Sequence, residues 1–528
     1  MAHPSRCILA VDLGTSGPKV ALVTPEGTIL ARTRKSVSTH FLPDGGIEQN
    51  PDDWWTAVCE ASRELLDAHP DLRDRVMAIS CASMYSTVVP VDAQGRPLMN
   101  AILWMDTRGA PYIEDITRGF VKIQGYGLRR ALVWIYLTGG IPTHSGKDSI
   151  AHVLYLKHER PEIYRETHQF LEPKDYLNLR MTGTFGATPE TMLLYWLTDH
   201  RDIHHVDYHP RLLRYAGVDR EKFPPLYRTL DVLGPLQADA AEELGLPAGI
   251  PVLAGTNDTH AAAIGAGAVQ DYDAHLYLGT SSWISCHLPY KKTDLFRNMA
   301  SLPSAIPGKY YLANEQECAG ACLNFLRDHL FYGDDALDTG PPPPDAYRRM
   351  DELAAQAPPG SDGVLFAPWL VGERTPVEDP WIRGGFFNVS LGTPRPALVR
   401  AVFEGVALNA RWLLEGIEHF LGRTLQTLRM VGGGAQSDLW CQIHADVLQR
   451  TILQIEDPIW AGVRGAAFLA AVALKQTTWE EIPNRVPIQN TFPPNPAHRE
   501  LYDRLYREFR NLYRAFRPIC ARLNGGGS

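Results

Sequence analysis

The sequence has no excess of basic residues. Its 51 Lys and Arg residues stand against 60 Asp and Glu residues, which gives a formal net charge of -9 at pH 7, and its isoelectric point is about 6.1. Nucleic acids and anionic membranes attract clustered lysines and arginines. We therefore expect neither a nucleic acid nor a membrane as a partner.

Long apolar runs are absent as well. No uncharged apolar run reaches the ~18 residues that a membrane span needs. The apolar run at residues 7–13 contains Asp12 and is followed by no small-residue cleavage pattern. It therefore predicts a strand rather than a signal peptide.

Cysteines with the spacing of metal or redox sites are also missing. The eight cysteines are scattered, and the closest two, Cys318 and Cys322, lack the two-residue gap of such sites. Their spacing favours two buried thiols on one face of a helix. This cysteine usage is typical of a reducing compartment, and we expect a cytoplasmic protein.

The chain is longer than a single hydrophobic core supports, with 528 residues. Residues 200–249 are polar, contain prolines and are rich in predicted loops. We therefore predict an N-terminal domain at residues 1–249, a C-terminal domain at 250–485, and a helical tail with a flexible end at 486–528. The less regular, glycine-containing stretch at residues 117–146 is predicted to be an insertion or a lid.

Two glycine-rich turns follow apolar strands. The first, Gly14-Thr15-Ser16-Gly17, joins a strand that ends near Asp12 to a strand that begins at Lys19, and this pattern predicts a hairpin. Free backbone N–H groups and hydroxyls in such a turn bind phosphate, and Asp12 is placed to hold Mg²⁺ through water. An unliganded turn explains this motif alone equally well. The second turn, Gly279-Thr280-Ser281-Ser282, follows another apolar strand, so the two hairpins predict related halves that hold one polyphosphate.

A single acid stands in a stretch of small residues. Asp258 follows an apolar run at residues 250–254 and lies within the stretch 255–267, which is rich in glycine and alanine. Small residues let a ligand approach the backbone, and a lone carboxylate there can accept a proton. The alternative is that Asp258 caps a helix that starts at Thr259.

Two further patterns point to a ligand site. Trp104, Asp106 and Arg108 follow an apolar strand at alternate positions, which presents three groups on one side to a polyhydroxylated ligand. The alternative is an ion pair between Asp106 and Arg108 on a solvated edge. Residues 432–434 are three glycines between a strand and a helix, a junction that lets a ring or a phosphate lie against the backbone, although packing alone also demands glycine at such junctions.

These motifs, taken together and in order, resemble the FGGY family of carbohydrate kinases. The pattern covers roughly residues 7–475. The matching motifs are Asp12-x-Gly14-Thr15 with Lys19, Trp104-x-Asp106-x-Arg108, Gly255-x-x-Asp258 with Gly265-x-Gly267, Gly279-Thr280-Ser281, Gly372-Glu-Arg-Thr-Pro376, and Gly432-Gly-Gly-Ala435-x-Ser437 with Ala445-Asp446.

The resemblance implies an α/β protein with two actin-like ATPase (ribonuclease H-like) domains. It implies that Mg-ATP and a small sugar meet in the cleft between the domains, and that the γ-phosphate of ATP passes to a sugar hydroxyl. Asp258 matches the catalytic base and Asp12 the acid near the metal. The implied nucleotide-binding residues are Gly14, Thr15, Ser16 and Lys19 in the first hairpin, Gly279, Thr280 and Ser281 in the second, and Gly433, Gly434, Ala435 and Ser437 in the loop against adenosine. The implied sugar-binding residues are Tyr85, Ser86, Trp104, Asp106, Arg108, Asp258 and Thr259. A homodimer is compatible with this resemblance.

The motif spelling favours xylulose as the sugar. Two departures weigh against assigning the sugar specificity of xylulose kinases directly to this chain. The Met-His pair of xylulose kinases falls on Tyr85-Ser86, and the Asn that often follows the catalytic Asp is Thr259. Ribulose, other ketoses, erythritol, arabitol and glycerol therefore stay open.

Two other classes of function are weighed beside a kinase. An actin-like or Hsp70-like nucleotide switch shares the phosphate hairpins, but it needs no acid at position 258 and should carry a peptide-binding or polymerisation surface. The other class is a non-catalytic sensor of sugar or nucleotide. Asp12, Asp258 and both intact hairpins argue against that sensor.

Overall fold

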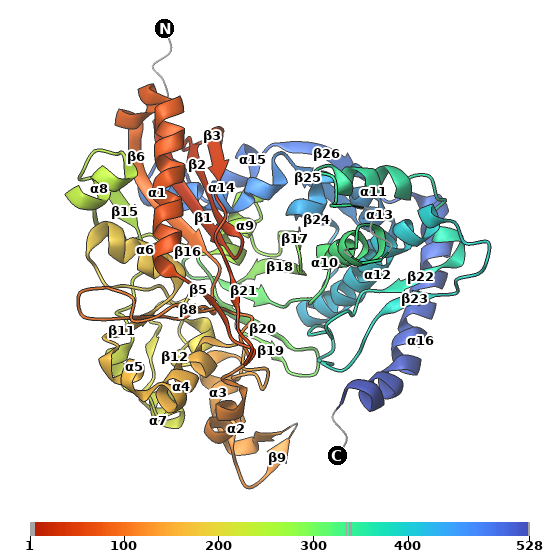
Figure 1. Cartoon of the computed structure of the whole chain (residues 1–528), viewed down its shortest axis with the longest axis horizontal. Coiled ribbons are helices and arrows are strands. Elements are labelled where there is room, and N and C mark those ends of the chain that lie inside the picture. The colour runs from red at the N-terminus through yellow and green to blue at the C-terminus, as the bar shows by residue number, and fades with distance from the viewer. Residues whose placement is uncertain (1–5, 124, 334, 337–339, 526–528) are drawn as a thin grey trace.

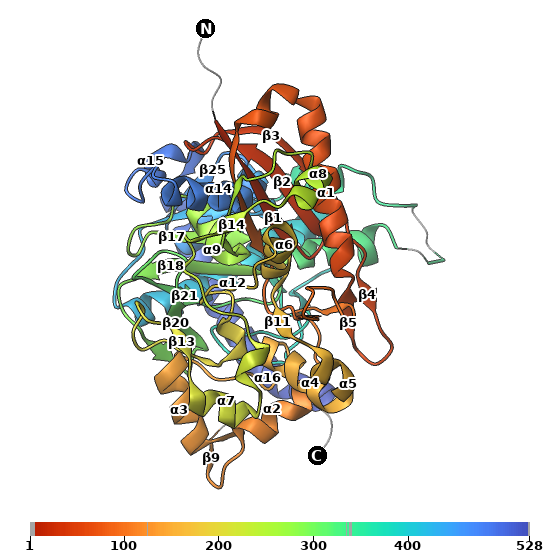
Figure 2. The same ribbon diagram turned by 90° about the vertical axis from the view of Figure 1, so that its left-hand side faces the viewer.

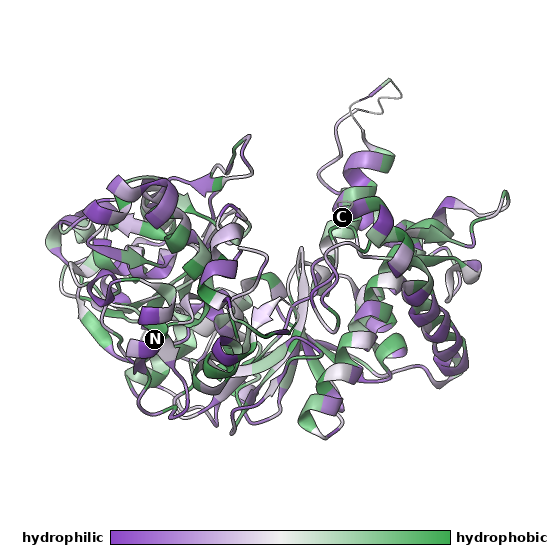
Figure 3. Cartoon of the chain, turned by 90° about the horizontal axis from the view of Figure 1, so that it is seen from below, coloured by the Kyte–Doolittle hydropathy of each residue, from purple (hydrophilic) through white to green (hydrophobic). Residues whose placement is uncertain are grey.

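Two α/β halves lie side by side, with the first strands on the left of Figure 1 and most of the later chain on the right. The computed structural model describes residues 6–525 except 124, 334 and 337–339. Each half is built on a mixed sheet. Helices on the outside carry both hydrophilic and hydrophobic residues (Figure 3). The predicted α/β class is confirmed.

The first sheet is built around the predicted N-terminal hairpin. Its first three strands are antiparallel neighbours, the next two run parallel to the first strand of the hairpin, and an antiparallel strand closes the far edge. In order these strands are β3 (Ile29–Arg34), β2 (Gly17–Val23), β1 (Cys7–Gly14), β6 (Val76–Ser83), β15 (Pro251–Leu253) and β14 (Val232–Pro235), and β16 (Thr256–Asn257) also pairs with β6.

The second sheet repeats this series of pairings. Two antiparallel pairings are followed by two parallel ones and a final antiparallel one. Because two sheets far apart in sequence share one pattern, the prediction of two related halves is supported. In order the strands are β21 (Tyr310–Ala313), β18 (Ser282–Leu288), β17 (Ala274–Leu278), β24 (Thr427–Val431), β25 (Thr451–Ile455) and β26 (Ile488–Phe492), and β20 (Met299–Pro303) and β19 (Thr293–Asp294) extend the edge beyond β21.

Helices cover the outer face of each sheet. In α1 the Asn50 side chain accepts a hydrogen bond from the Asp52 N–H and Pro51 occupies the first turn, so the helix starts where the sequence predicts. Its apolar residues pack on the first sheet together with two other helices. The first sheet is covered by α1 (Pro51–Ala68), α6 (Pro173–Thr182) and α8 (Ala238–Leu244), and the second by α10 (Gly320–Phe325), α12 (Arg395–Leu421) and α13 (Asp438–Leu448), with α16 (Arg499–Asn524) packed against α13.

Two helices lie between the sheets and join the halves. α9 (Asp258–Gly265) and α14 (Ala461–Ala473) pack against strands of both sheets. The two helices touch through backbone, since a Cβ built on Gly265 would lie 1.8 Å from the Ala461 carbonyl oxygen and one built on Gly465 would lie 1.8 Å from that of Ala261. Glycine is therefore required at both positions, and α9 is held firmly at the centre of the molecule.

A helical lobe lies below the first sheet in Figures 1 and 2. It has its own apolar core. It includes the segment 117–146, predicted as an insertion or a lid, whose described residues form two short strands and a helix. The elements of this region are α2 (Ala110–Thr117), β9 (Lys122–Ile123), β10 (Tyr126–Gly127), α3 (Leu128–Thr138), α4 (Ser149–Glu159), α5 (Pro161–Glu166), the pair β7 (Val89–Val91) and β11 (Gln169–Leu171), the pair β12 (Thr198–Asp199) and β13 (Asp207–Tyr208), and α7 (Pro210–Ala216).

The predicted domain limits can be compared with the observed elements at three places. The limit at 249/250 falls inside the first sheet, because β15 and β16 pair with β6. The predicted tail contributes β26 to the second sheet, and its helix α16 packs on the C-terminal core. Residues 526–528 of the predicted flexible end lie outside the described residues. No helix in the described part of the chain is long and apolar enough to cross a membrane.

Candidate active site

A cavity of about 1050 Å³ lies between the two halves. Its walls come from the hairpin turns of both sheets, the end of β6, the start of α9 and the triple-glycine turn after β24. Segments from positions 12 to 462 meet there, so the structure brings most of the predicted motifs to one place.

The first hairpin supplies a carboxylate and a positively charged lysine on neighbouring strands. Asp12 on β1 and Lys19 on β2 are register partners, and the Lys19 Nζ donates to Asp12 Oδ2 at 3.0 Å. The Asp12 charge raises the pKa of Lys19, so the lysine stays charged. In the turn, a Cβ on Gly17 would lie 2.2 Å from the Lys35 carbonyl oxygen. Gly14, Thr15, Ser16 and Lys19, the residues of this hairpin predicted to bind the nucleotide, all line the cavity.

The second hairpin presents its turn to the same cavity. Leu278 on β17 pairs with Ser282 on β18, and Gly279, Thr280 and Ser281 between them line the cavity. The N–H groups of residues 319 and 321 donate to the Thr280 carbonyl oxygen at 2.8 and 3.1 Å. These bonds fix the carbonyls of the turn toward α10.

Asp258 is the first residue of α9 and lines the cavity. The helix is capped by Asn257, whose side chain accepts from the His260 N–H, so the capping role considered for Asp258 belongs to its neighbour. Among the described residues the Oδ1 atom of Asp258 is buried and has no hydrogen-bond partner. Burial, and secondarily the charge of Asp12, raise the pKa of Asp258 to about 7. A carboxylate with this pKa suits general base catalysis near neutral pH.

The triple-glycine turn forms the opposite wall. A Cβ built on Gly433 meets no atom within 4 Å, whereas one on Gly434 would lie 2.4 Å from Leu278 Cδ2. Ser437 lines the cavity, caps α13 and donates a short hydrogen bond to Asp351. Ala435 is fully buried and is not part of the cavity lining, so the structure gives no support to its prediction as a nucleotide-binding residue. Its carbonyl oxygen accepts from Gln454 instead.

The predicted sugar-binding residues are divided by the structure. Tyr85, Ser86, Trp104 and Thr259 line the cavity. The Trp104 Nε1 donates to the Thr15 hydroxyl at 3.0 Å, which joins the predicted sugar-binding residues to the turn of the first hairpin. The Ser86 hydroxyl already donates a hydrogen bond to the Lys147 carbonyl oxygen.

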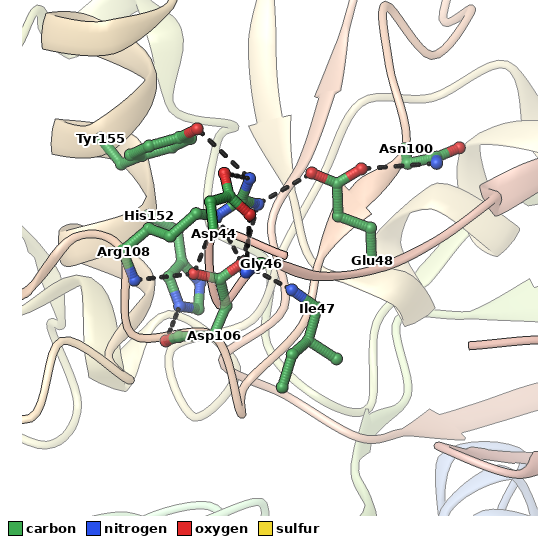
Figure 4. Close-up of polar contacts among 9 residues, drawn as sticks. All are labelled: Asp44, Gly46, Ile47, Glu48, Asn100, Asp106, Arg108, His152 and Tyr155. Carbon is green, nitrogen blue, oxygen red and sulfur yellow. Dashed lines mark hydrogen bonds and ion pairs between the residues drawn. The ribbon is translucent and has the colours of Figure 1, made fainter. Parts of the chain in front are cut away.

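Asp106 and Arg108 do not line the cavity, which corrects their prediction as sugar ligands. Figure 4 shows Arg108 surrounded by Asp44, Glu48 and Asp106, with Tyr155 beside it. The Arg108 guanidinium forms ion pairs with Asp106 and Glu48 at 2.8 Å and with Asp44 at 3.3 Å. The considered ion pair is therefore present but buried rather than solvated. Through Glu48 and Ile47 on β5, Arg108 and Asp106 are bound to the sheet of β4 (His40–Phe41), β5 (Ile47–Gln49) and β8 (Ala101–Ile102).

Sequence reasoning missed a charged group beside Tyr85 and Ser86, at the part of the cavity predicted to bind the sugar and called the sugar end below. Lys147 and Arg374 line the cavity from opposite halves. Arg374 forms ion pairs with Glu315 at 2.7 Å and Glu317 at 3.0 Å, and the Lys147 Nζ lies 3.5 Å from Glu317. Arg374 lies in the Gly372–Pro376 motif noted above, but nothing in the sequence indicated its partners. Also missed is Asp148, which lines the cavity and accepts from the Thr143 N–H and the Trp196 indole.

Comparison with family models decides the identity. The model described as the N-terminal domain of the FGGY family of carbohydrate kinases matches residues 7–265, and that of the C-terminal domain matches residues 274–474. The chain belongs to the FGGY family of carbohydrate kinases. This FGGY kinase is therefore a phosphotransferase with an alcohol group as acceptor and ATP as the phosphate donor of its family.

Curated relatives match this FGGY kinase over nearly its whole length. A xylulose kinase from Staphylococcus epidermidis is 28% identical, with 98% of each chain covered. The xylulose kinase of Escherichia coli is 29% identical, with 97% of this chain and 100% of the other covered. More distant relatives have other names, an autoinducer-2 kinase of Klebsiella pneumoniae at 26% identity (96% and 93% covered) and a gluconokinase of Bacillus subtilis at 23% (88% and 87%).

A solved structure confirms the predicted two-domain fold of actin-like ATPase type. A xylulose kinase from Rhodospirillum rubrum matches this FGGY kinase with a TM-score of 0.81 and 27% identity, covering 98% of this chain and 100% of the other.

The chemistry of Asp12 is compatible with a magnesium site. In the described residues no group of three His, Cys, Asp or Glu side chains is placed to hold a metal ion. Mg²⁺ usually keeps several waters and is held by one or two carboxylates and the substrate phosphates. Asp12 is a carboxylate of this kind, because it lines the cavity at the first hairpin, and Gly462 leaves its Oδ2 uncrowded where a Cβ would lie 2.3 Å away.

Proposed function

We propose that this FGGY kinase transfers the γ-phosphate of Mg-ATP to a hydroxyl of a neutral ketose, with xylulose as the favoured sugar. The observation that carries the proposal is Asp258, which lines the cavity beside both phosphate turns with one buried carboxylate oxygen unpartnered. Xylulose is favoured because the two relatives described at 28% and 29% identity are named for it.

The nucleotide would lie along the wall of glycine turns. Gly433 leaves room for adenosine against the backbone, and the turns after β1 and β17 offer N–H groups to the phosphates. Lys19 supplies a fixed positive charge at the first turn. Asp12 would hold Mg²⁺ through water, and the bound ion would neutralise phosphate charge.

Asp258 would act on the sugar hydroxyl. Its unpartnered oxygen can accept a hydrogen bond from the hydroxyl, orient it toward the γ-phosphate, and take its proton as the new O–P bond forms. The raised pKa of Asp258 makes it a better proton acceptor than an exposed aspartate. Positioning and charge neutralisation supply most of the rate in phosphoryl transfer.

The charges at the sugar end favour a neutral sugar over a sugar acid. The two cations there, Lys147 and Arg374, are already paired with Glu315 and Glu317. Asp148 adds a further acid to the lining. A substrate carboxylate beside Lys147 and Arg374 would meet these acids and two cations that are already paired, whereas sugar hydroxyls can hydrogen-bond to carboxylates.

The test is an ADP-release assay with Mg-ATP and a panel of D-xylulose, D-ribulose, erythritol, arabitol, glycerol and gluconate. We expect the highest kcat/KM with D-xylulose and none with gluconate above background. Gluconate as the best substrate would overturn the preference for a neutral sugar. If no compound of the panel causes ADP release while ATP still binds, the alternative of a non-catalytic sensor of sugar or nucleotide would be favoured.

A further inference from the structure

A fully buried acid, Glu172, connects two segments of the cavity wall. Its Oε2 accepts from the Thr87 N–H at 3.0 Å, and its Oε1 accepts from the Ser149 hydroxyl at 2.8 Å. Glu172 itself does not line the cavity. Thr87 directly follows Tyr85 and Ser86, and Ser149 directly follows Lys147 and Asp148.

A second bond joins the same two segments. The Ser86 hydroxyl donates to the Lys147 carbonyl oxygen at 2.6 Å, and Ser86 has a left-handed backbone with φ of 58°. A serine in this conformation is held by its surroundings rather than by its own preference. The shape of the 85–87 turn therefore depends on contacts with residues 147–149.

Keeping Glu172 buried has a cost in stability. Its side chain is completely shielded from solvent, and burial raises its pKa well above the usual range. No Lys or Arg forms an ion pair with it in the described part of the chain. A buried acid that hydrogen-bonds to two cavity segments makes sense if its role is to hold their side chains in place.

We propose that Glu172 is a positioning residue that sets the affinity for the sugar by holding Tyr85 and Lys147 in register across the sugar end of the cavity. The proposal rests on the proposed function, because it requires the sugar to lie against these two residues. It predicts an effect on the sugar rather than on ATP, since the hydrogen bonds of Glu172 go to Thr87 and Ser149 and not to the turns at 14–17, 279–282 or 432–434.

The chain offers a control at Glu404 in the C-terminal half, which differs from Glu172 in its ion pair with Arg400 at 2.8 Å. Glu404 is also buried, and it accepts from the Gly360 N–H at 2.9 Å and from the Ser361 hydroxyl at 2.8 Å. None of these three residues lines the cavity. Ser149→Ala and Ser361→Ala therefore remove the same type of bond, one beside the sugar end and one away from it.

The experiment measures KM for the best sugar of the panel and KM for ATP in Glu172→Leu, Glu172→Gln, Ser149→Ala and Ser361→Ala. We expect Glu172→Leu to raise the sugar KM about tenfold or more, and Ser149→Ala about threefold. Glu172→Gln should stay near wild type, because its amide oxygen still accepts from Thr87 and its amide group can donate to the Ser149 hydroxyl. Ser361→Ala should leave the sugar KM unchanged, and KM for ATP should hold in every variant.

An unchanged sugar KM in folded Glu172→Leu would overturn the positioning role, as would a parallel rise in KM for ATP. If Glu172→Leu does not fold, the sugar KM of Ser149→Ala is compared with that of Ser361→Ala. Equal values would overturn the proposal. A wild-type protein that phosphorylates no sugar of the panel would instead overturn the proposed function and this inference with it.

Discussion

Replacing Asp258 with Asn tests the base directly. The two side chains have nearly the same shape, and the Oδ1 atom of Asp258 has no hydrogen-bond partner among the described residues to lose. The variant should therefore fold and bind ATP as the wild type does. Because a positioned base typically contributes about 10²- to 10⁴-fold, kcat should fall by that factor.

The raised pKa of Asp258 also predicts an effect on stability. An acid whose pKa rises from 3.8 to about 7 on folding destabilises the native state as pH rises through that interval, and the full cost applies above pH 7. The shift of roughly 3 units corresponds to about 4 kcal/mol at most. Asp258→Asn removes this cost, so at pH 8 the variant should be more stable than the wild type while being nearly inactive.

Two assays check this prediction. Urea unfolding at pH 5 and pH 8 measures stability, and ADP release with the preferred sugar measures kcat, with ATP binding followed by titration. The wild-type kcat/KM should fall below pH 7 as Asp258 becomes protonated. Wild-type turnover by Asp258→Asn would refute the base assignment, and equal or lower stability at pH 8 would refute the proposed cost of burial.

Three further predictions address other parts of the molecule. Gly433→Val should weaken ATP binding without loss of stability, whereas Gly434→Val should also lower the unfolding midpoint because its Cβ meets Leu278; normal ATP affinity in Gly433→Val would contradict the adenosine wall. Arg108→Ala should destabilise the fold by about 3–5 kcal/mol in urea unfolding, since it leaves the buried Asp106 unpaired. Burial lowers the pKa of His260 to about 3 and of His275 to about 4, so the contribution of these histidines to stability should be full above pH 6.5 and fall as pH drops toward 4, opposite in sign to that of Asp258; a flat profile in this range in Asp258→Asn would contradict neutral histidines.

The sequence predicted those parts of the site that depend on local chain geometry. Asp12, Asp258 and the turns at 14–17 and 279–282 lie together as expected, because glycine and hydroxyl residues at strand ends force tight turns. The triple glycine also forms a wall, but Ala435 does not, since the chain turns inward after Gly434 and buries it. Local spacing fixed where a turn occurs, not which side each residue faces.

Predictions that depended on distant partners gained no support from the structure or were absent. Alternate spacing placed Asp106 and Arg108 on one side of a strand, but Asp44 and Glu48, about 60 positions earlier, hold Arg108 away from the cavity. The pairing of Arg374 with Glu315 and of Lys147 with Glu317 likewise depends on how the halves meet. Parallel pairing of β15 and β16 with β6 explains why the domain limit at 249 lies within a sheet.

Phosphorus NMR of a reaction with Mg-ATP and D-xylulose tests the central claim most directly, because it separates transfer to the sugar from hydrolysis. The account predicts that the γ-phosphate signal is replaced by that of a sugar phosphomonoester in the wild type, and that this signal is absent with Asp258→Asn over the same time. ATP loss that yields inorganic phosphate alone, or a phosphomonoester formed equally well by Asp258→Asn, would contradict it.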